Sequence, residues 1–129
     1  MRSEAWNNHC VVLTRLLRFD EARLAGERAI ALDESDAHAW HNLGATLGGL
    51  HRYEEAVRAF EKAIELKPDY SRPYYNGSWA LAKLGRVDQM YAYIERAIDL
   101  DPAVRKLASA DVYFEPFRDS PRFQRVLGK

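Results

Sequence analysis

Apolar residues along the chain follow helical spacing in paired segments separated by short polar breaks. In the middle of the sequence they recur every three or four positions over 40–50, and again over 56–64. This spacing marks one face of an amphipathic helix, so the two stretches together predict a helical hairpin. Pro68 and Pro102 end the second helices because proline cannot continue the hydrogen-bond ladder. Gly85, at a break between helices, can take the left-handed conformation that ends a helix.

The same pattern repeats with a period of 34 residues, the step that separates Trp6, Trp40 and Tyr74. Other positions that keep this step are Leu13, Leu47 and Leu81; Leu16, Leu50 and Leu84; Ala29, Ala63 and Ala97; and Leu32, Leu66 and Leu100. A further position holds only small residues, Cys10, Gly44 and Ser78, which indicates two helices in close approach. The period predicts stacked units at 3–36, 37–70 and 71–104.

The middle unit resembles the tetratricopeptide repeat. It carries Ala-Trp-His-Asn-Leu-Gly at 39–44, Tyr-Glu-Glu-Ala-Val-Arg-Ala-Phe at 53–60 and Leu-Lys-Pro at 66–68. The outer units depart from the family pattern at His9, Gly26, Gly77 and Met90. The resemblance implies an all-α fold, an α-solenoid of three helical hairpins in a right-handed superhelical arc.

The tail from Arg105 breaks the period and is interpreted as a cap. A fourth unit would place a large aromatic residue where Ala108 stands, and it would not accommodate Pro116. The aromatic run 111–123 resembles the element that closes many bacterial tetratricopeptide proteins. Ser120 as N-cap and Pro121 at the first helical position predict a short capping helix. We therefore expect one domain over residues 1–129, with the cap at 105–129.

Composition limits the classes of partner and the compartment that we expect for this protein. Lys plus Arg and Asp plus Glu each number 19, so no basic excess is available to neutralise nucleic acid. The lone Cys10 cannot form an internal disulfide, which fits a reducing compartment. No apolar window reaches the length of a membrane span and no signal-peptide pattern opens the sequence, so we expect a cytoplasmic protein without membrane insertion.

In the family, the first helix of each hairpin lines a concave surface, and the resemblance places a binding groove there. Asn8, Asn42 and Asn76 share one offset, so we expect a ladder of amides that pairs with a peptide backbone. Tyr75 and Trp79 lie one turn apart beside cations, and they suit an apolar or acidic side chain or a terminal carboxylate. The expected groove residues are Asn8, His38, His41, Asn42, Arg72, Tyr75, Asn76, Trp79 and Lys83.

Alternatives stay open for each feature of this groove. Asparagine is common at its offset in the family, including in repeats with no known ligand. The aromatic tail can instead fold back and bury Trp79. Gly48 and Gly49 remove side chains from the groove, which indicates either a close backbone approach or a frayed helix end.

The sequence predicts neither catalysis nor a bound cofactor. His38 and His41 are three residues apart, but no cysteine or carboxylate completes a metal-ligand set with them and His51. The chain has no nucleophile elbow and no phosphate-binding glycine loop. Cys10 occupies a packing position, where a thiol is inert. We expect no enzyme activity, no metal and no cofactor.

The resulting hypothesis is a scaffold or adaptor that binds a peptide or protein segment of another protein in its groove. One alternative is a self-associating structural module, a weak homo-oligomer, because Val12 lies on an outer side that no earlier unit covers. Another is a chaperone-tail receptor with a carboxylate clamp. Asn42 and Arg72 suit such a clamp, whereas Asn7, Val11 and Asn76 stand where lysine, asparagine and arginine are expected.

Overall fold

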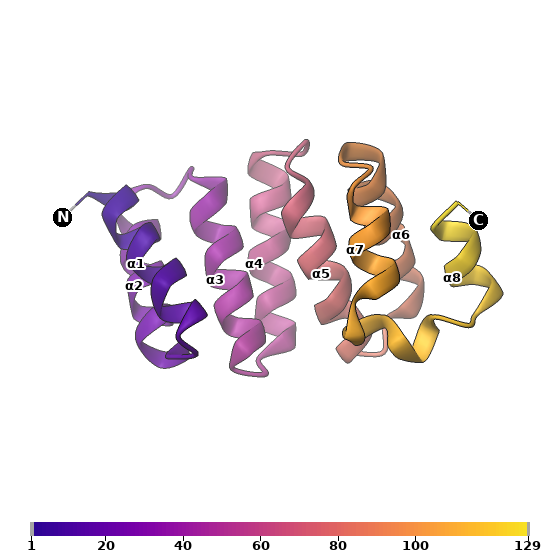
Figure 1. The fold of residues 1–129 in the computed structure, drawn as a ribbon. Helices are drawn as coiled ribbons and strands as arrows, with labels where there is room; N and C mark the ends of the chain where they lie inside the picture. The colour runs from indigo at the N-terminus through magenta and orange to yellow at the C-terminus, as the bar shows by residue number, and fades with distance from the viewer. Residues whose placement is uncertain (1, 129) are drawn as a thin grey trace.

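The computed structural model describes residues 2–128, and the two ends of the expected domain, residues 1 and 129, lie outside that range. The helices are α1 (Ser3–Arg15), α2 (Phe19–Leu32), α3 (Ala37–Gly49), α4 (Tyr53–Leu66), α5 (Ser71–Lys83), α6 (Val87–Leu100), α7 (Val104–Ala110), the 3-10 helix η1 (Val112–Phe117) and α8 (Pro121–Val126). Helices α1 to α6 pair as three consecutive hairpins that stack in a row (Figure 1). The predicted all-α solenoid of three hairpins is confirmed.

Helices end where the sequence predicts. Helices α4 and α6 stop at Leu66 and Leu100, each two residues before a proline. Gly85 has φ of +74°, the left-handed conformation expected of it. Leu17 and His51 occupy the equivalent turns with φ of 61°, although a side chain makes this conformation unfavourable.

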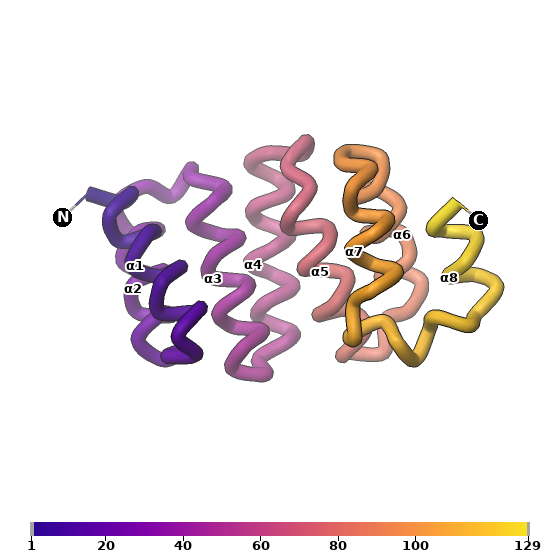
Figure 2. Tube along the Cα trace, viewed as in Figure 1, coloured from indigo at the N-terminus to yellow at the C-terminus, as the bar shows by residue number. Residues whose placement is uncertain are grey.

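The tail closes the C-terminal end of the stack. Figure 2 shows the chain leaving α7, crossing the end of the row through η1 and finishing in α8. Phe114, Phe123 and Leu127 are buried in the core that runs through the second and third hairpins. Ser120 is the N-cap of α8 as predicted, but its side chain makes no capping hydrogen bond. Helix α7 was not predicted, because the period of large residues stops before it.

The first hairpin has a core of its own. Cys10, Leu13, Ala22 and Ala25 form a small buried cluster with Trp6 packed against it, separate from the cluster of the other hairpins and the cap. The first hairpin packs on the second through α1, α2 and α3, but its buried apolar cluster does not join the larger one.

A paired change of residue size explains one departure of the outer units from the family pattern. A Cβ built on Gly77 would lie 2.9 Å from Cε2 of Tyr93, so the glycine makes room for a ring that the first two units lack. In the middle unit, Gly44 likewise leaves space for the buried ring of Phe60. Each of these two glycines is the complement of one large neighbour in a close-packed core.

Within residues 2–128, no helix combines the length and the apolar character that a membrane crossing requires.

Candidate peptide-binding groove

Three adjoining cavities lie along the first helices of the hairpins and the start of the cap. The arginine pocket, about 170 Å³, is lined by Val11, Thr14, Arg15, His41, Asn42, Ala45, Arg72 and Asn76. The tryptophan pocket, about 190 Å³, is lined by Ala45, Phe60, Tyr75, Asn76, Trp79, Asp111 and Tyr113. The cap pocket, about 380 Å³, is lined by Ser71, Arg72, Tyr75, Asn76, Asp101, Val104 and Leu107. Asn76 borders all three, so they form one continuous groove.

Six of the nine expected residues line this groove: His41, Asn42, Arg72, Tyr75, Asn76 and Trp79. The other three border none of its cavities. Asn8 is exposed on α1. His38 is exposed, and its ring packs edge-on against Tyr70 at 4.7 Å between centroids. The ammonium of Lys83 lies 5.9 Å from the ring centre of Tyr113.

The expected ladder of Asn8, Asn42 and Asn76 is wrong. The amide nitrogen of Asn42 donates to Oδ1 of Asn7 at 2.8 Å, and that of Asn76 donates to Nε2 of His41 at 2.8 Å. Each bond thus joins an asparagine to the residue one position before its counterpart in the preceding hairpin. Asn42 and Asn76 thus hold neighbouring hairpins together, and each commits one N–H of its amide to that contact.

The first of these bonds continues into a helix cap. The amide nitrogen of Asn7 donates to Oδ2 of Asp36 at 3.2 Å. The other carboxylate oxygen of Asp36 accepts from the backbone nitrogen of His38 and caps α3. Asp36, Asn7 and Asn42 therefore form one polar network across the first interface.

His41 is a neutral structural residue. Burial of its ring, together with the positive charge of Arg72, lowers the pKa of His41 from 6.5 to about 4. Because Nε2 accepts from Asn76, the proton lies on Nδ1, which faces the hydroxyl of Tyr70 at 3.4 Å. The groove therefore contains an uncharged imidazole beside an exposed guanidinium.

Trp79 is partly covered by the cap. Its ring packs edge-on against Tyr113 at 4.7 Å and against Tyr53 at 5.6 Å. Its Nε1 is buried and has no hydrogen-bond partner within residues 2–128. A Cβ on Gly48 would lie 2.6 Å from Cζ3 of Trp79, so the glycine provides the space for this ring. Gly49 does the same for Phe19 of the preceding hairpin, so the two glycines accept aromatic rings rather than a ligand backbone.

The cap also holds Tyr75. The hydroxyl of Tyr75 donates to Oδ2 of Asp111 at 2.5 Å, and its ring packs against Phe114 at 6.0 Å. The pKa of Tyr75 is raised far above its usual range, mainly by burial and secondly by the bond to Asp111. The sequence did not identify Asp111 and Tyr113 as groove residues, because the period that aligns the hairpins stops before them. The aromatic tail was the only signal.

Of the residues that the structure describes, two cations and no carboxylate line the arginine pocket. Arg15 and Arg72 are exposed there, and neither takes part in an ion pair within residues 2–128. The carboxylates of the groove line the two neighbouring pockets, where Asp111 accepts from the hydroxyl of Tyr75 and Asp101 accepts from the backbone nitrogen of Ala103. The arginine pocket can therefore receive an anionic group by charge-assisted hydrogen bonds.

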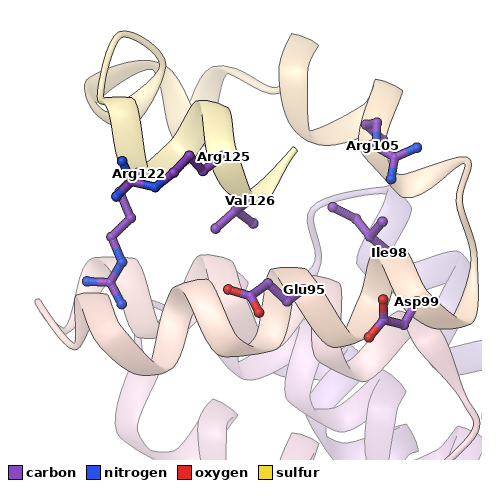
Figure 3. A pocket seen from close by; sticks show the side chains of 7 residues that line it. All are labelled: Glu95, Ile98, Asp99, Arg105, Arg122, Arg125 and Val126. Carbon is purple, nitrogen blue, oxygen red and sulfur yellow. The ribbon is translucent and has the colours of Figure 1, made fainter. Parts of the chain in front are cut away.

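A cavity of about 410 Å³ lies outside the groove, between α6 and the cap (Figure 3). Glu95 and Asp99 of α6 face three arginines of α7 and α8 across it. Arg122 is one of them: it pairs with Asp88 at 2.5 Å and lies over the ring of Tyr91. These contacts fasten the cap to α6. Within residues 2–128, no group of three or more His, Cys, Asp or Glu side chains is placed to hold a metal ion.

Stacked helical hairpins with a groove along their first helices define the class of this protein, an α-solenoid of the kind that serves as a protein–protein interaction module. The family model of the tetratricopeptide repeat matches residues 37–70 and again residues 71–104, together just over half of the chain. The chain belongs to the tetratricopeptide repeat family. No curated protein matches it in sequence.

Solved structures share this fold at low sequence identity. MamA is 20% identical, with a TM-score of 0.80 over 98% of this chain and 77% of that one. The second TPR of Spaghetti (RPAP3), bound to the HSP90 peptide SRMEEVD, is 21% identical, with a TM-score of 0.75 over 78% and 94%. The type III secretion chaperone SycD of Yersinia enterocolitica, in complex with a peptide of the translocator YopD, is 15% identical, with a TM-score of 0.74 over 97% and 88%. These similarities concern the fold alone.

Proposed function

We propose that this protein is an adaptor that binds a segment of another protein in the groove, and that the segment carries an acidic group for the arginine pocket. The supporting observation is the pair Arg15 and Arg72, exposed in one small pocket and free of ion pairs within residues 2–128. Two guanidinium groups close together repel each other, and a bound carboxylate relieves that repulsion while accepting bidentate hydrogen bonds.

The tryptophan pocket offers an adjacent site for an apolar side chain. It shares Ala45 and Asn76 with the arginine pocket, and it is walled by the rings of Trp79 and Tyr113. Aromatic walls of this kind provide much of the affinity at protein interfaces. An acceptor carried by the ligand is one way of pairing the buried Nε1 of Trp79, which otherwise costs stability.

Two structures of similar fold support a peptide ligand, and one of them supports acidic residues in it. The Spaghetti domain binds a peptide with the sequence SRMEEVD, in which three residues are acidic. A carboxylate clamp of the chaperone-tail type is less well supported here, because the amide nitrogens of Asn42 and Asn76 already donate to Asn7 and His41. SycD, which has a similar fold, also binds a peptide.

A random peptide library panned on the immobilised protein tests the proposal. We expect enriched peptides that combine Asp or Glu with an aromatic or large aliphatic residue. The Arg15→Gln, Arg72→Gln double variant should lose the acidic preference, because it keeps hydrogen-bonding capacity and removes the charge. Arg58→Gln on α4, exposed and outside the three cavities, is the matched control.

The proposal is overturned if no peptide is enriched, or if the double variant enriches the same sequences as the native protein. Synthetic copies of an enriched peptide with a free and with an amidated C-terminus then separate an acidic side chain from a terminal carboxylate. Affinity lost on amidation would favour the clamp alternative.

A further inference from the structure

Exposed apolar side chains are concentrated in the first hairpin. The largest exposures there are those of Val12, Leu16, Leu17, Leu24 and Leu32, each more than half exposed. Val12 and Leu16 have a simple explanation. Their counterparts one period later are Thr46, which is buried, and Leu50, which is half-buried. Val12 and Leu16 therefore belong to the face on which successive repeats stack.

Leu17 and Leu24 lack this explanation. Leu17 is 72% exposed and Leu24 is 58% exposed. Their counterparts in the middle unit are His51 and Arg58, which are exposed although a hairpin packs on each side of that unit. A further repeat stacked on α1 would therefore leave Leu17 and Leu24 open as well.

The third unit shows the same contrast. It has Gly85 and Ala92 at these positions, so the first unit alone has a large apolar side chain at both. Leu17 also adopts the left-handed conformation, with φ of 61°, which costs less energy for a glycine such as Gly85 at the equivalent position. Both leucines expose a large apolar side chain, and Leu17 does so in an unfavourable backbone conformation, so their surface is better explained by an interface than by the fold.

Leu24 is the apolar centre of a self-complementary stripe on α2. Glu21, Leu24 and Arg28 follow a spacing of three and four residues, which places them on one face of the helix, and Leu17 lies in the turn just before the helix begins at Phe19. Leu24 lies midway between Glu21 and Arg28, and all three border a cavity of about 340 Å³ between α1 and α2. If a second α2 packs antiparallel about an axis near Leu24, Glu21 faces Arg28 of the second copy, and the reverse pair forms by symmetry.

We propose that two copies of this protein associate through α2, packed antiparallel about Leu24. The apolar part of the interface is Leu17 and Leu24 of each copy, and the Glu21 to Arg28 pairs fix the register. The present partners of these charges leave them available. Glu21 pairs with Arg18 at 2.7 Å in an exposed contact, a kind of pair that contributes little, and Arg28 only lies over the ring of Trp6 at 5.7 Å. Leu17, Glu21, Leu24 and Arg28 border none of the three groove cavities, so dimerisation and peptide binding use different side chains.

Sedimentation equilibrium of the intact chain over rising concentration tests the proposal. We expect a monomer–dimer equilibrium. Leu24→Arg and Leu17→His give the first hairpin the residues of the middle one, so they should leave the circular dichroism melt intact and weaken the dimer by about tenfold or more. Val12→Thr, the same exchange on the stacking face, should leave the dimer unchanged, as should Arg72→Gln in the groove.

Charge exchange tests the register. Glu21→Arg alone should weaken the dimer, because it opposes two like-charged pairs, whereas Glu21→Arg with Arg28→Glu should restore it. The proposal is overturned by a monomer at every concentration, by growth beyond the dimer, or by a dimer that Val12→Thr breaks and Leu24→Arg does not. Failure of the double exchange to restore association would reject the antiparallel arrangement.

Discussion

The ring of Trp79 occupies the space that a side chain on Gly48 would need. A Cβ at that glycine would lie 2.6 Å from Cζ3 of the indole. Gly48 lies on α3 and Trp79 on α5, so the two residues couple neighbouring hairpins directly beside the groove. This relationship gives the glycine a structural role, and it fixes the position of the aromatic wall of the tryptophan pocket.

Gly48→Ala should therefore destabilise the protein despite its better helix propensity. The clash costs about 1 to 3 kcal/mol, against a gain of about 1 kcal/mol for removing a helical glycine. Urea unfolding measures the sum, and tryptophan fluorescence reports the displaced ring. In a Trp79→Ala background the same substitution should become stabilising, because only the helix term remains. A destabilisation of equal size in both backgrounds would contradict the contact.

His41 should make the protein less stable in acid. Its folded pKa of about 4 lies below the ordinary value of 6.5, so the unfolded chain takes up the proton first. The contribution is complete above pH 6.5 and is lost as the pH falls from 6.5 towards 4, to a total of about 3 kcal/mol. Urea unfolding at a series of pH values measures this slope.

The control for that slope comes from the first hairpin. The position equivalent to His41 in the first hairpin is Asn7, whose Oδ1 accepts from the amide nitrogen of Asn42. The substitution His41→Asn therefore copies the first hairpin. The variant keeps an acceptor for Asn76 and removes the titrating group. It should lack this part of the acid sensitivity, and an unchanged slope would assign the effect to other groups.

The sequence was sufficient to predict the fold but only part of the groove. The step from Leu13 to Leu47 and Leu81 identifies a position that every hairpin buries, so repeat packing follows from spacing alone. The hydrogen bonds of Asn42 with Asn7 and of Asn76 with His41 join residues 35 positions apart, and that of Tyr75 with Asp111 joins a hairpin to the cap. The period of 34 aligns equivalent residues but does not predict this offset, because the offset depends on how far one hairpin is rotated against the next.

The sequence also did not reveal that a small residue at one position compensates for a large one at another. Gly77 departs from the family pattern only because Tyr93, sixteen positions later, brings a ring to it. Read along the sequence, the two changes are unrelated, and only their contact shows that one accommodates the other. The cap and its last helix were predicted, but the contacts of Asp111 and Tyr113 with the groove were not, because the chain after Arg105 has no earlier copy to be compared with.

Removal of one cap aromatic should loosen the end of the stack. Phe123 is fully buried in the core shared by the last two hairpins and the cap, so Phe123→Ala should cost about 3 to 5 kcal/mol. Hydrogen exchange should rise more in α5 and α6 than in α1 and α2, whose core is separate. Val112→Ala, at a side chain that is 70% exposed, is the control and should change little. A uniform rise along the whole chain would contradict the division into two cores.

Substitutions at Asn7 and Asn8 distinguish the expected asparagine ladder from the observed hydrogen-bond network. Asn7→Asp keeps an acceptor for Asn42, loses the donor to Asp36 and puts a second carboxylate beside it, 3.2 Å being the present distance between the paired atoms. We expect a loss of about 1 to 3 kcal/mol at pH 7 in urea unfolding. Asn8→Asp, on the exposed neighbouring residue, should be close to neutral.

The difference in unfolding free energy between the two variants should become smaller as the pH falls. Two close carboxylates raise the pKa of one of them, and the proton that it takes up restores a donor. Comparing the variants at each pH cancels the acid sensitivity of His41, which both retain. Equal stability of the two variants at pH 7 would contradict the network of Asn7 with Asp36 and Asn42.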